Sequence, residues 1–311
     1  VLDDGSNLQN KDTVYPAPGL SATNTVRVGD EVLPFDAVLG YGFSKYRVHP
    51  LTEPVFVSSN PRTEQPAINK GDYRIASINV LNYFNGDGAG NGFPTSRGAS
   101  TAVEFAKQRD KIIAAISAMN ADLVGLLEIE NDGFSEQSAI ADLVRGLNAK
   151  AGAELWAFVD FNVAKVGTDE ITSAIIYRKD KVVQAGTAAI GNAAPFDYGN
   201  RPLISQSFKL QQSGELLNLT VVHLKSKGSC PSDKTDLANI DSGDGQGCWN
   251  GLRLQAATAM GNWLAGYPTG VETDNSVIVG DFNAYMQEDP IRAMNDSGYV
   301  QVSQQLHGNK I

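Results

Sequence analysis

The hydrophobic residues of this chain follow two different periods. Apolar side chains recur three or four positions apart in three stretches, which predicts helices over residues 104–119, 137–150 and 252–264. Short apolar or alternating runs predict strands over residues 73–81, 122–128, 156–163, 172–178, 203–210, 216–224 and 276–280. Strands and helices mixed in this way favour a layered α/β domain over residues 72–311.

The beginning of the chain has a different pattern. In residues 1–57, short strand-like runs alternate with turns, and the spacing between residues 28–30 and residues 38–41 is similar to that of consecutive strands in an OB-like β-barrel. This segment is short for a whole barrel, so we expect an incomplete one. Residues 58–71 contain two prolines and few apolar side chains, which predicts a linker.

Composition narrows the class of protein. The 311 residues include 25 Lys and Arg against 35 Asp and Glu, which gives a net charge of −10. This excess of acid argues against binding nucleic acid over the whole surface, but a local basic groove is compatible with it. Charged residues make up only 19% of the chain, and this favours the loop-rich surface of a secreted protein. Because no apolar run approaches the roughly 20 residues that span a bilayer, we expect no membrane insertion.

The two cysteines indicate whether the protein resides in an oxidising or a reducing compartment. Cys230 and Cys248 lie in a polar stretch rich in Gly, Ser and Asp. We expect a disulfide that closes this loop, and therefore an oxidising compartment, with two buried free thiols as the alternative. A metal site here is disfavoured because no His lies nearby. The chain begins at Val1 with neither an initiator Met nor a signal peptide, so we expect a mature product or a fragment.

Polar side chains that carry possible chemistry stand at the ends of apolar strands. Asn79, Glu128 and His223 each end such a run, and Asp281 and Asn283 follow a fourth. Side chains at strand ends converge at one rim of a sheet, where the active sites of layered α/β proteins commonly form. We therefore expect these residues to share one site.

Each of these residues also has a purely structural explanation. Glu128 alone could be a solvated strand end, and Glu130 and Asp132 show that acid is common in its loop. His223 could be a buried core histidine, although its ring also suits proton transfer or contact with a phosphate. A bare Gly-Asp-x-Asn sequence is usually a turn. The four features in this order, each after an apolar strand, favour the functional interpretation.

Five short segments together resemble a known family. They are residues 77–82 (SINVLN), 126–128 (LLE), 175–178 (IIYR), 222–226 (VHLKS) and 280–283 (GDFN). In this order they are similar to the signatures of the endonuclease/exonuclease/phosphatase family, to which DNase I and exonuclease III belong. The similarity is greatest to the large secreted bacterial nucleases, which carry an OB-like segment before the catalytic domain. It covers residues 70–311.

The resemblance implies a fold and a reaction. The fold is a four-layered α/β sandwich of two β-sheets flanked by helices. The reaction is hydrolysis of phosphodiester bonds with a divalent metal, usually Mg²⁺, with Mn²⁺ or Ca²⁺ as alternatives. A divalent ion neutralises phosphate charge and a base activates water, so acid clustered at the site is consistent with action on DNA.

The resemblance also assigns roles. Glu128 is the expected principal metal ligand, with Asn79 beside it, and His223 contacts the scissile phosphate. Asp281 and Asn283 orient the attacking water. The resemblance also implies an aromatic wall at Tyr177 and an acid that orients His223, either Asp169 or Glu170, and we expect local Lys and Arg to bind the substrate. The basic candidates are Arg97, Lys107, Arg109, Lys225, Lys227 and Arg253, with Lys225 and Arg253 foremost.

One departure from the family pattern concerns the end of the chain. The family has a second catalytic His, next to an Asp, some distance after the Gly-Asp-x-Asn strand, and that His is the general base. Here His307 is the only late histidine, and it lies in a polar helix end rather than after an apolar strand. We therefore expect a C-terminal part to be missing and this chain to bind metal but to cleave DNA slowly or not at all.

Three functions follow as hypotheses. The first is a secreted, metal-dependent nuclease that degrades extracellular DNA or RNA with little sequence preference, with no protein partner implied. The second keeps the fold but acts on a phospholipid or an inositol phosphate, which would require a hydrophobic rim instead of a basic one. The third is a nucleic-acid-binding module without activity, in which bases stack on Phe35, Tyr41, Phe43 and Tyr46.

Overall fold

The computed structural model describes residues 1–8, 14–21, 23–63 and 71–308. The chain divides into two compact units, Val1–Asn69 and Lys70–Ile311. The division falls within the expected linker over residues 58–71, of which residues 64–70 lie outside the described part. The two units are described separately below. In the described residues, no helix is long and apolar enough to cross a membrane.

The first unit contains two small antiparallel sheets. Strands β1 (Glu31–Val32) and β4 (Phe56–Val57) pair, and β2 (Ala37–Gly42) and β3 (Lys45–Pro50) form a hairpin. Prolines follow or end several of these strands, and proline has no N–H group to extend a ladder. The described residues form no closed barrel, so the expected OB-like segment is not shown.

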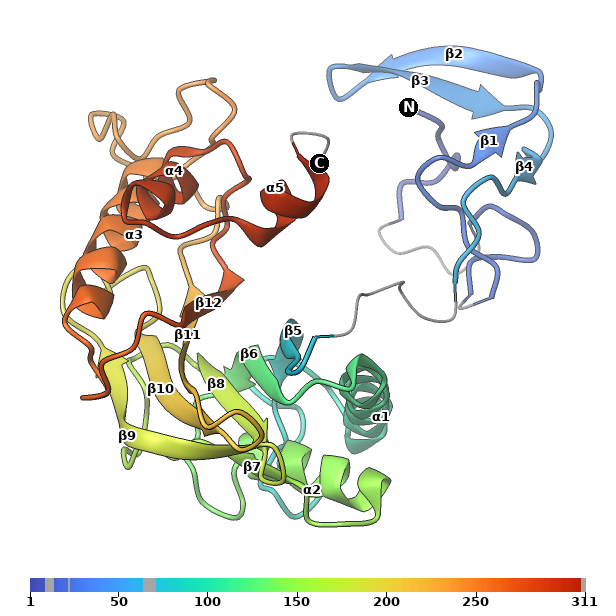
Figure 1. Cartoon of the computed structure of the whole chain (residues 1–311). Coiled ribbons are helices and arrows are strands. Elements are labelled where there is room, and N and C mark those ends of the chain that lie inside the picture. Colours follow the sequence, from blue (N-terminus) through green and yellow to red (C-terminus); the bar gives the residue numbers. More distant parts are fainter. Residues whose placement is uncertain (9–13, 22, 64–70, 309–311) are drawn as a thin grey trace. The chain divides into compact units, whose positions relative to one another are not determined.

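The second unit is built on two four-stranded sheets (Figure 1). The first has the order β5-β6-β8-β7, and the second has the order β12-β11-β10-β9. The bounds are β5 Ile75–Tyr83, β6 Leu123–Glu130, β7 Trp156–Phe158, β8 Ile171–Arg178, β9 Val182–Gly191, β10 Leu203–Leu210, β11 Leu216–His223 and β12 Ser276–Asp281. In each sheet one pair of neighbours is parallel, namely β5 with β6 and β11 with β12.

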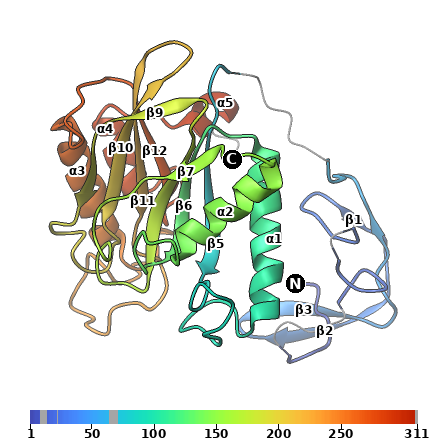
Figure 2. The same ribbon diagram turned by 90° about the horizontal axis from the view of Figure 1, so that it is seen from below.

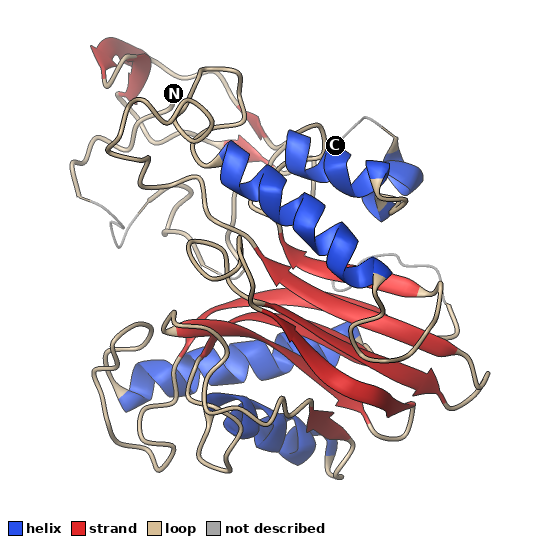
Figure 3. Cartoon of the chain, turned by 90° about the vertical axis from the view of Figure 1, so that its left-hand side faces the viewer, coloured by secondary structure: helices blue, strands red, loops and turns tan. Residues whose placement is uncertain are grey.

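Helices cover the outer faces of both sheets. Apolar side chains of α1 (Ala102–Met119) and α2 (Ala139–Ala151) pack on the first sheet. Those of α3 (Asn250–Ala265) and α4 (Asp289–Asp296) pack on the second sheet, and the short α5 (Val302–His307) follows. Figures 2 and 3 show the resulting order of helix, sheet, sheet and helix. The expected four-layered α/β sandwich is confirmed.

Local signals explain where the first two helices begin. The Thr101 hydroxyl accepts a hydrogen bond from the Glu104 N–H, and the Ser138 hydroxyl accepts one from the Ala141 N–H. These bonds satisfy amide groups that have no partner within the helix. Both helices end at residues with left-handed backbone, Asn120 and Gly152. Helices α1 and α2 therefore match the predicted ranges to within two residues at each end.

The two sheets pack face to face through an apolar layer, and they come closest at Gly125. A Cβ atom at this position would lie 2.5 Å from Val279 Cγ2 and 2.9 Å from Val221 Cγ2. Gly125 therefore lets β6 approach both β11 and β12. The layer around it is dry and close-packed, with Leu123, Leu127, Leu219 and Val221 almost fully buried.

Three elements differ from the sequence-based expectation. Strand β9 is absent from the prediction because seven of its ten residues are Ala, Gly, Thr or Gln, and its pairing with β10 decides its conformation. Helix α4 is also absent from the prediction, since its eight residues are too few for a helical period to be recognised in a window of about 11–18 residues. The predicted strand over residues 156–163 ends at Phe158, because Asp160 accepts a hydrogen bond from the Asn162 N–H and turns the chain.

Candidate active site

Glu128 and Asn79 form one side of the candidate site. The Asn79 side-chain amide donates to Glu128 Oε1 at 2.8 Å, and the Asn82 backbone N–H donates to Oε2 at 3.1 Å. The pairing of β6 with both neighbours is irregular at this level, and Glu128 has a left-handed backbone with φ 65°. This distortion ends the regular ladder and turns the carboxylate toward β5.

His223, Asp281 and Asn283 form the other side. His223 and Asp281 are Cα partners at the ends of the parallel strands β11 and β12. Asp281 Oδ1 accepts from the Asn283 N–H at 2.8 Å, and the Asn283 side-chain amide donates to the Leu224 carbonyl at 3.0 Å. Gly280 allows the chain to leave β12 close to β11. A Cβ atom at this position would lie 2.0 Å from the Val222 carbonyl oxygen, and its φ is 136°.

The packing of the sheets brings the two sides together. Gly125 faces Val221 and Val279, while Glu128 stands three residues after Gly125, and His223 and Asp281 stand two residues after those valines. Both Glu128 and Asp281 act electrostatically on the His223 ring. The structure thus unites all five residues expected at the strand ends.

Arg201 is a member of this cluster that the sequence analysis missed. It precedes β10, its backbone N–H donates to the His223 carbonyl at 3.2 Å, and its Nη1 lies 3.3 Å from His223 Nε2. Its Nε donates to Asp169 Oδ2 at 3.1 Å. The guanidinium therefore lies between a carboxylate and the buried imidazole. An Arg–Pro pair before a strand gives no sequence signal for this role.

The environment keeps His223 neutral. Burial lowers its pKa to about 4, and the neighbouring Arg201 charge acts in the same direction against the carboxylates of Asp281 and Glu128. Because guanidinium can only donate, the facing Nε2 atom is the acceptor and the proton resides on Nδ1. Nδ1 is buried and has no hydrogen-bond partner in the described residues.

The acid expected to orient His223 occupies a different place. Asp169 lies in the cluster, but its carboxylate pairs with Arg201 and, at 3.1 Å, with Arg97. Glu170 instead accepts a hydrogen bond from the Ser96 hydroxyl. Neither carboxylate forms a hydrogen bond with the imidazole, but the Asp169 charge acts on His223, and Asp169 also holds Arg201 beside the ring. The two acids were alternatives in the sequence, and the geometry places Asp169 nearer.

Two of the expected site residues do not join the cluster. Tyr177 pairs with Leu123 at the opposite end of β6 from Glu128, and its ring packs on Phe208. The expected aromatic wall at Tyr177 is therefore wrong, because β8 runs antiparallel to β6. Arg253 is fully buried, and its guanidinium donates to the carbonyls of Lys225, Cys248 and Gln246. It holds a loop together and does not reach a substrate.

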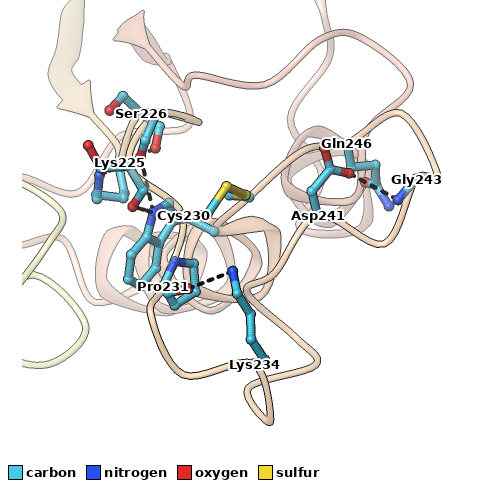
Figure 4. The surroundings of a disulfide bond; sticks show 12 residues. Lys225, Ser226, Cys230, Pro231, Lys234, Asp241, Gly243 and Gln246 are labelled. Carbon is cyan, nitrogen blue, oxygen red and sulfur yellow. Dashed lines mark hydrogen bonds between the residues drawn. A yellow bond between two sulfur atoms is a disulfide. The ribbon is translucent and has the colours of Figure 1, made fainter.

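The disulfide loop borders the site. Cys230 and Cys248 are joined, as expected, and Figure 4 shows Lys225 near this bond. Lys225 follows β11, and its Nζ lies 5.1 Å from the centroid of the Trp249 ring. Its pKa is lowered by burial and by the charges of Arg201 and Arg253. Lys225 thus stays at the rim, where sequence analysis expects a substrate contact.

The donor set of Glu128 and Asn79 limits which metal could bind. No cluster of three or more His, Cys, Asp or Glu residues suited to a metal occurs among the described residues. Each Glu128 oxygen accepts one hydrogen bond, so about half of its roughly four lone-pair positions stay open. Mg²⁺ needs only one or two carboxylates because it keeps several waters, whereas Ca²⁺ takes six to eight oxygen ligands. The residues therefore fit Mg²⁺ or Mn²⁺ better than Ca²⁺.

A large hollow of the second unit lies elsewhere. It has a volume of about 830 Å³ and is lined by α3, α4 and the outer side of β12, including Ile278, Phe282 and Met294. Most of these side chains are apolar. The hollow borders the loop after Asp281 but contains none of the strand-end residues, so the chemistry belongs to the convergent strand ends.

Comparisons with known proteins give structural similarity alone. No protein-family model and no curated protein matches the sequence. Human Nocturnin's catalytic domain aligns at 15% identity over 71% of this chain and 68% of its own, with a TM-score of 0.44. An endonuclease/exonuclease/phosphatase family protein from Bacteroides thetaiotaomicron aligns at 15% over 73% and 69%, with a TM-score of 0.46. A mannosyl-6-phosphatase from the same organism aligns at 15% over 75% and 74%, with a TM-score of 0.47.

Proposed function

We propose that this chain is a secreted, metal-dependent phosphodiesterase of the DNase I-like kind that acts on DNA or RNA. The observation that carries the proposal is the convergence of two strand ends from different sheets. One presents the Glu128 carboxylate held by Asn79, and the other presents His223 beside Asp281. Arg201 supplies a fixed positive charge beside His223.

Each residue of the site has a separate role in the proposed hydrolysis of a phosphodiester. Glu128 and Asn79 would hold the divalent ion, which neutralises charge on the phosphate when bound. Arg201 lies beside His223 with donors for a phosphate oxygen. Asp281, itself oriented by the Asn283 N–H, is placed to accept a proton from the attacking water. His223, neutral and buried, accepts a hydrogen bond from Arg201 at Nε2 and so holds the guanidinium in place for the phosphate.

The basic residues at the rim of the site support a nucleic-acid substrate. Lys225 and Lys227 follow the end of β11, and Arg97 pairs with Asp169 of the cluster. A local basic rim of this kind suits a polyanion even though the net charge is −10. The disulfide supports secretion, because such bonds persist in oxidising compartments.

The test is cleavage of plasmid DNA and of a labelled RNA by excess protein over hours, with Mg²⁺, with Mn²⁺ and with EDTA. We expect slow, metal-dependent cleavage that Glu128→Gln and His223→Ala each abolish. Glu136→Gln, an exposed Glu on the same side of the first sheet, and His49→Ala, in the first unit, are the matched controls and should cleave like the wild type.

Two outcomes would contradict the proposal. Cleavage that survives EDTA and both substitutions would come from another site or a contaminant. Release of phosphate from an inositol phosphate or a phospholipid, with neither nucleic acid cleaved, would favour the second substrate class instead.

A further inference from the structure

Tyr285 is an exposed aromatic side chain next to the candidate site. It stands two residues after Asn283, and 76% of its surface is exposed. The loop that carries it is fixed on both sides. The Asn283 amide donates to the Leu224 carbonyl, and the Glu288 N–H donates to the Tyr285 carbonyl at 2.9 Å. The Tyr285 ring is therefore available to a ligand on a loop that is held in place.

Lys227 holds this ring from one side. Its Nζ lies 4.6 Å from the Tyr285 ring centroid and also pairs with the Glu288 carboxylate, which is only 6% exposed. Glu288 has one further oxygen that is buried without a hydrogen-bond partner, so its charge is directed at Lys227. The cation restrains the ring while most of the ring surface stays open to solvent.

The neighbouring charges suit a phosphate chain. Lys227 stands four residues after His223, and Lys225 lies between them in sequence. Lys225 has no carboxylate partner among the described residues, and its ammonium contacts the carbonyls of Ser226 and Gly228 and the Trp249 ring. Tyr285 therefore offers an exposed aromatic face beside Lys227, and Lys225 adds a positive charge that no carboxylate balances. Aromatic faces and positive charge together bind single-stranded nucleic acid by stacking and by charge.

We propose that Tyr285 is a stacking platform for a nucleobase next to the reacting phosphate, with Lys227 fixing its ring and Lys225 contacting the phosphate chain. This inference rests on the proposed function and deepens it. It makes the substrate an unpaired or locally opened strand with bases, since a ring that stacks needs an exposed base face. A sugar phosphate without a base would gain nothing from Tyr285.

Binding of short oligonucleotides in EDTA tests this without any cleavage. Fluorescence anisotropy would compare a labelled oligothymidylate of eight nucleotides with an abasic chain of the same length. Tyr285→Ala should weaken binding of the oligothymidylate on the order of tenfold and leave the abasic chain unchanged. Tyr285→Phe and Tyr285→Trp should bind like the wild type, because both keep an aromatic face. Tyr267→Ala, an exposed Tyr beyond the far end of α3, is the control and should show no change.

The binding experiment has three outcomes that would overturn the stacking role of Tyr285. Equal binding of the oligothymidylate by wild type and Tyr285→Ala, with nucleic-acid cleavage intact, would overturn the stacking role and leave the proposed function standing. A Tyr285→Ala variant that loses both ligands equally would show a general defect of the loop and would also overturn it. A wild type that binds neither oligonucleotide would overturn this inference, whereas the cleavage experiment with Mg²⁺ or Mn²⁺ decides the proposed function separately.

Discussion

The two sheets contribute opposite charges to one site. The end of β6 presents a carboxylate held by two amide groups, one from Asn79 and one from Asn82. The ends of β10 and β11 present a buried neutral imidazole and the guanidinium of Arg201. A cation suits the first end and a phosphate anion suits the second. The sandwich therefore brings together two half-sites, neither of which can polarise and hold a phosphodiester alone.

The sheets also differ in how firmly they hold these groups. Six of the eight residues of β6, including Leu123 and Leu127, are buried, and only Glu128 and Glu130 are partly exposed. Every residue of β12 is partly exposed, because it is an edge strand with no further strand beside it in the described residues. We therefore expect substitutions on β6 to cost stability and those at the end of β12 to cost function.

The largest expected effect comes from removing the charge of the first half-site. Glu128→Gln keeps the size of the side chain but loses the carboxylate that would hold the metal. We expect the single-turnover rate of DNA cleavage to fall about 10³-fold, since metal ligation is worth several kcal/mol in the transition state. Titration calorimetry should show weaker Mn²⁺ binding, with Glu136→Gln as the control. Undiminished Mn²⁺ affinity would place the metal elsewhere.

Removing the charge of the second half-site should have a smaller effect. Arg201→Ala loses donors for the phosphate, and we expect a rate about 10²-fold lower, similar to the loss of one preorganised donor in other enzymes. The His223 pKa should rise from about 4, because one of the two causes that lower it is removed. Nuclear magnetic resonance of the His223 ring would measure this. An unchanged pKa would mean that burial alone keeps the imidazole neutral.

The contact between the sheets can be tested at Gly125. Gly125→Ala places a Cβ atom 2.5 Å from Val279 Cγ2, and we expect the free energy of unfolding to fall by about 1–3 kcal/mol. Urea denaturation would measure the loss. Gly228→Ala is the control, since the nearest atom that its Cβ would meet is Ser226 Oγ at 4.0 Å. Equal stability of both variants would show that the sheets can separate at this point without cost.

The smallest expected effect is a dependence of stability on pH. The unfolded chain binds a proton at His223 with a pKa near 6.5, whereas the folded chain does so only near 4. The stability is therefore fully present above pH 6.5 and is lost as the pH falls toward 4, by about 1 kcal/mol between pH 7 and pH 5.5. Urea denaturation of wild type and His223→Asn at both values would measure this. An identical pH dependence of the two proteins would mean that His223 titrates normally when folded.

The sequence predicted the two half-sites but not what joins them. Asn79, Glu128, His223 and Asp281 were found because each ends an apolar strand, and strand ends are readable from a period of two. Arg201 could not be found, because its role depends on its position across β10 and β11 from His223, which only the sheet register determines. Arg253 was predicted wrongly, because its charge suggested a surface contact with the substrate. In the structure its buried guanidinium donates to three carbonyls.

The elements of the fold were predictable where local signals decide them, but not where pairing with another strand does. Helices with clear caps were located to within two residues, because local hydrogen bonds decide where they begin. Strand β9, rich in Ala and Gly, was missed because its conformation depends on β10 rather than on its own side chains. The direction of β8 decided that Tyr177 lies far from Glu128, and sequence alone does not give the direction of a strand.

We expect the two half-sites, at Glu128 and at His223, to act as one catalytic centre. A double-mutant cycle of Glu128→Gln and His223→Ala, measured as single-turnover cleavage of DNA, tests it most directly. If the residues act together on one phosphate, the double variant should be about as slow as the slower single variant. Rate losses that multiply would contradict the claim and would mean that the sheets carry two independent functions.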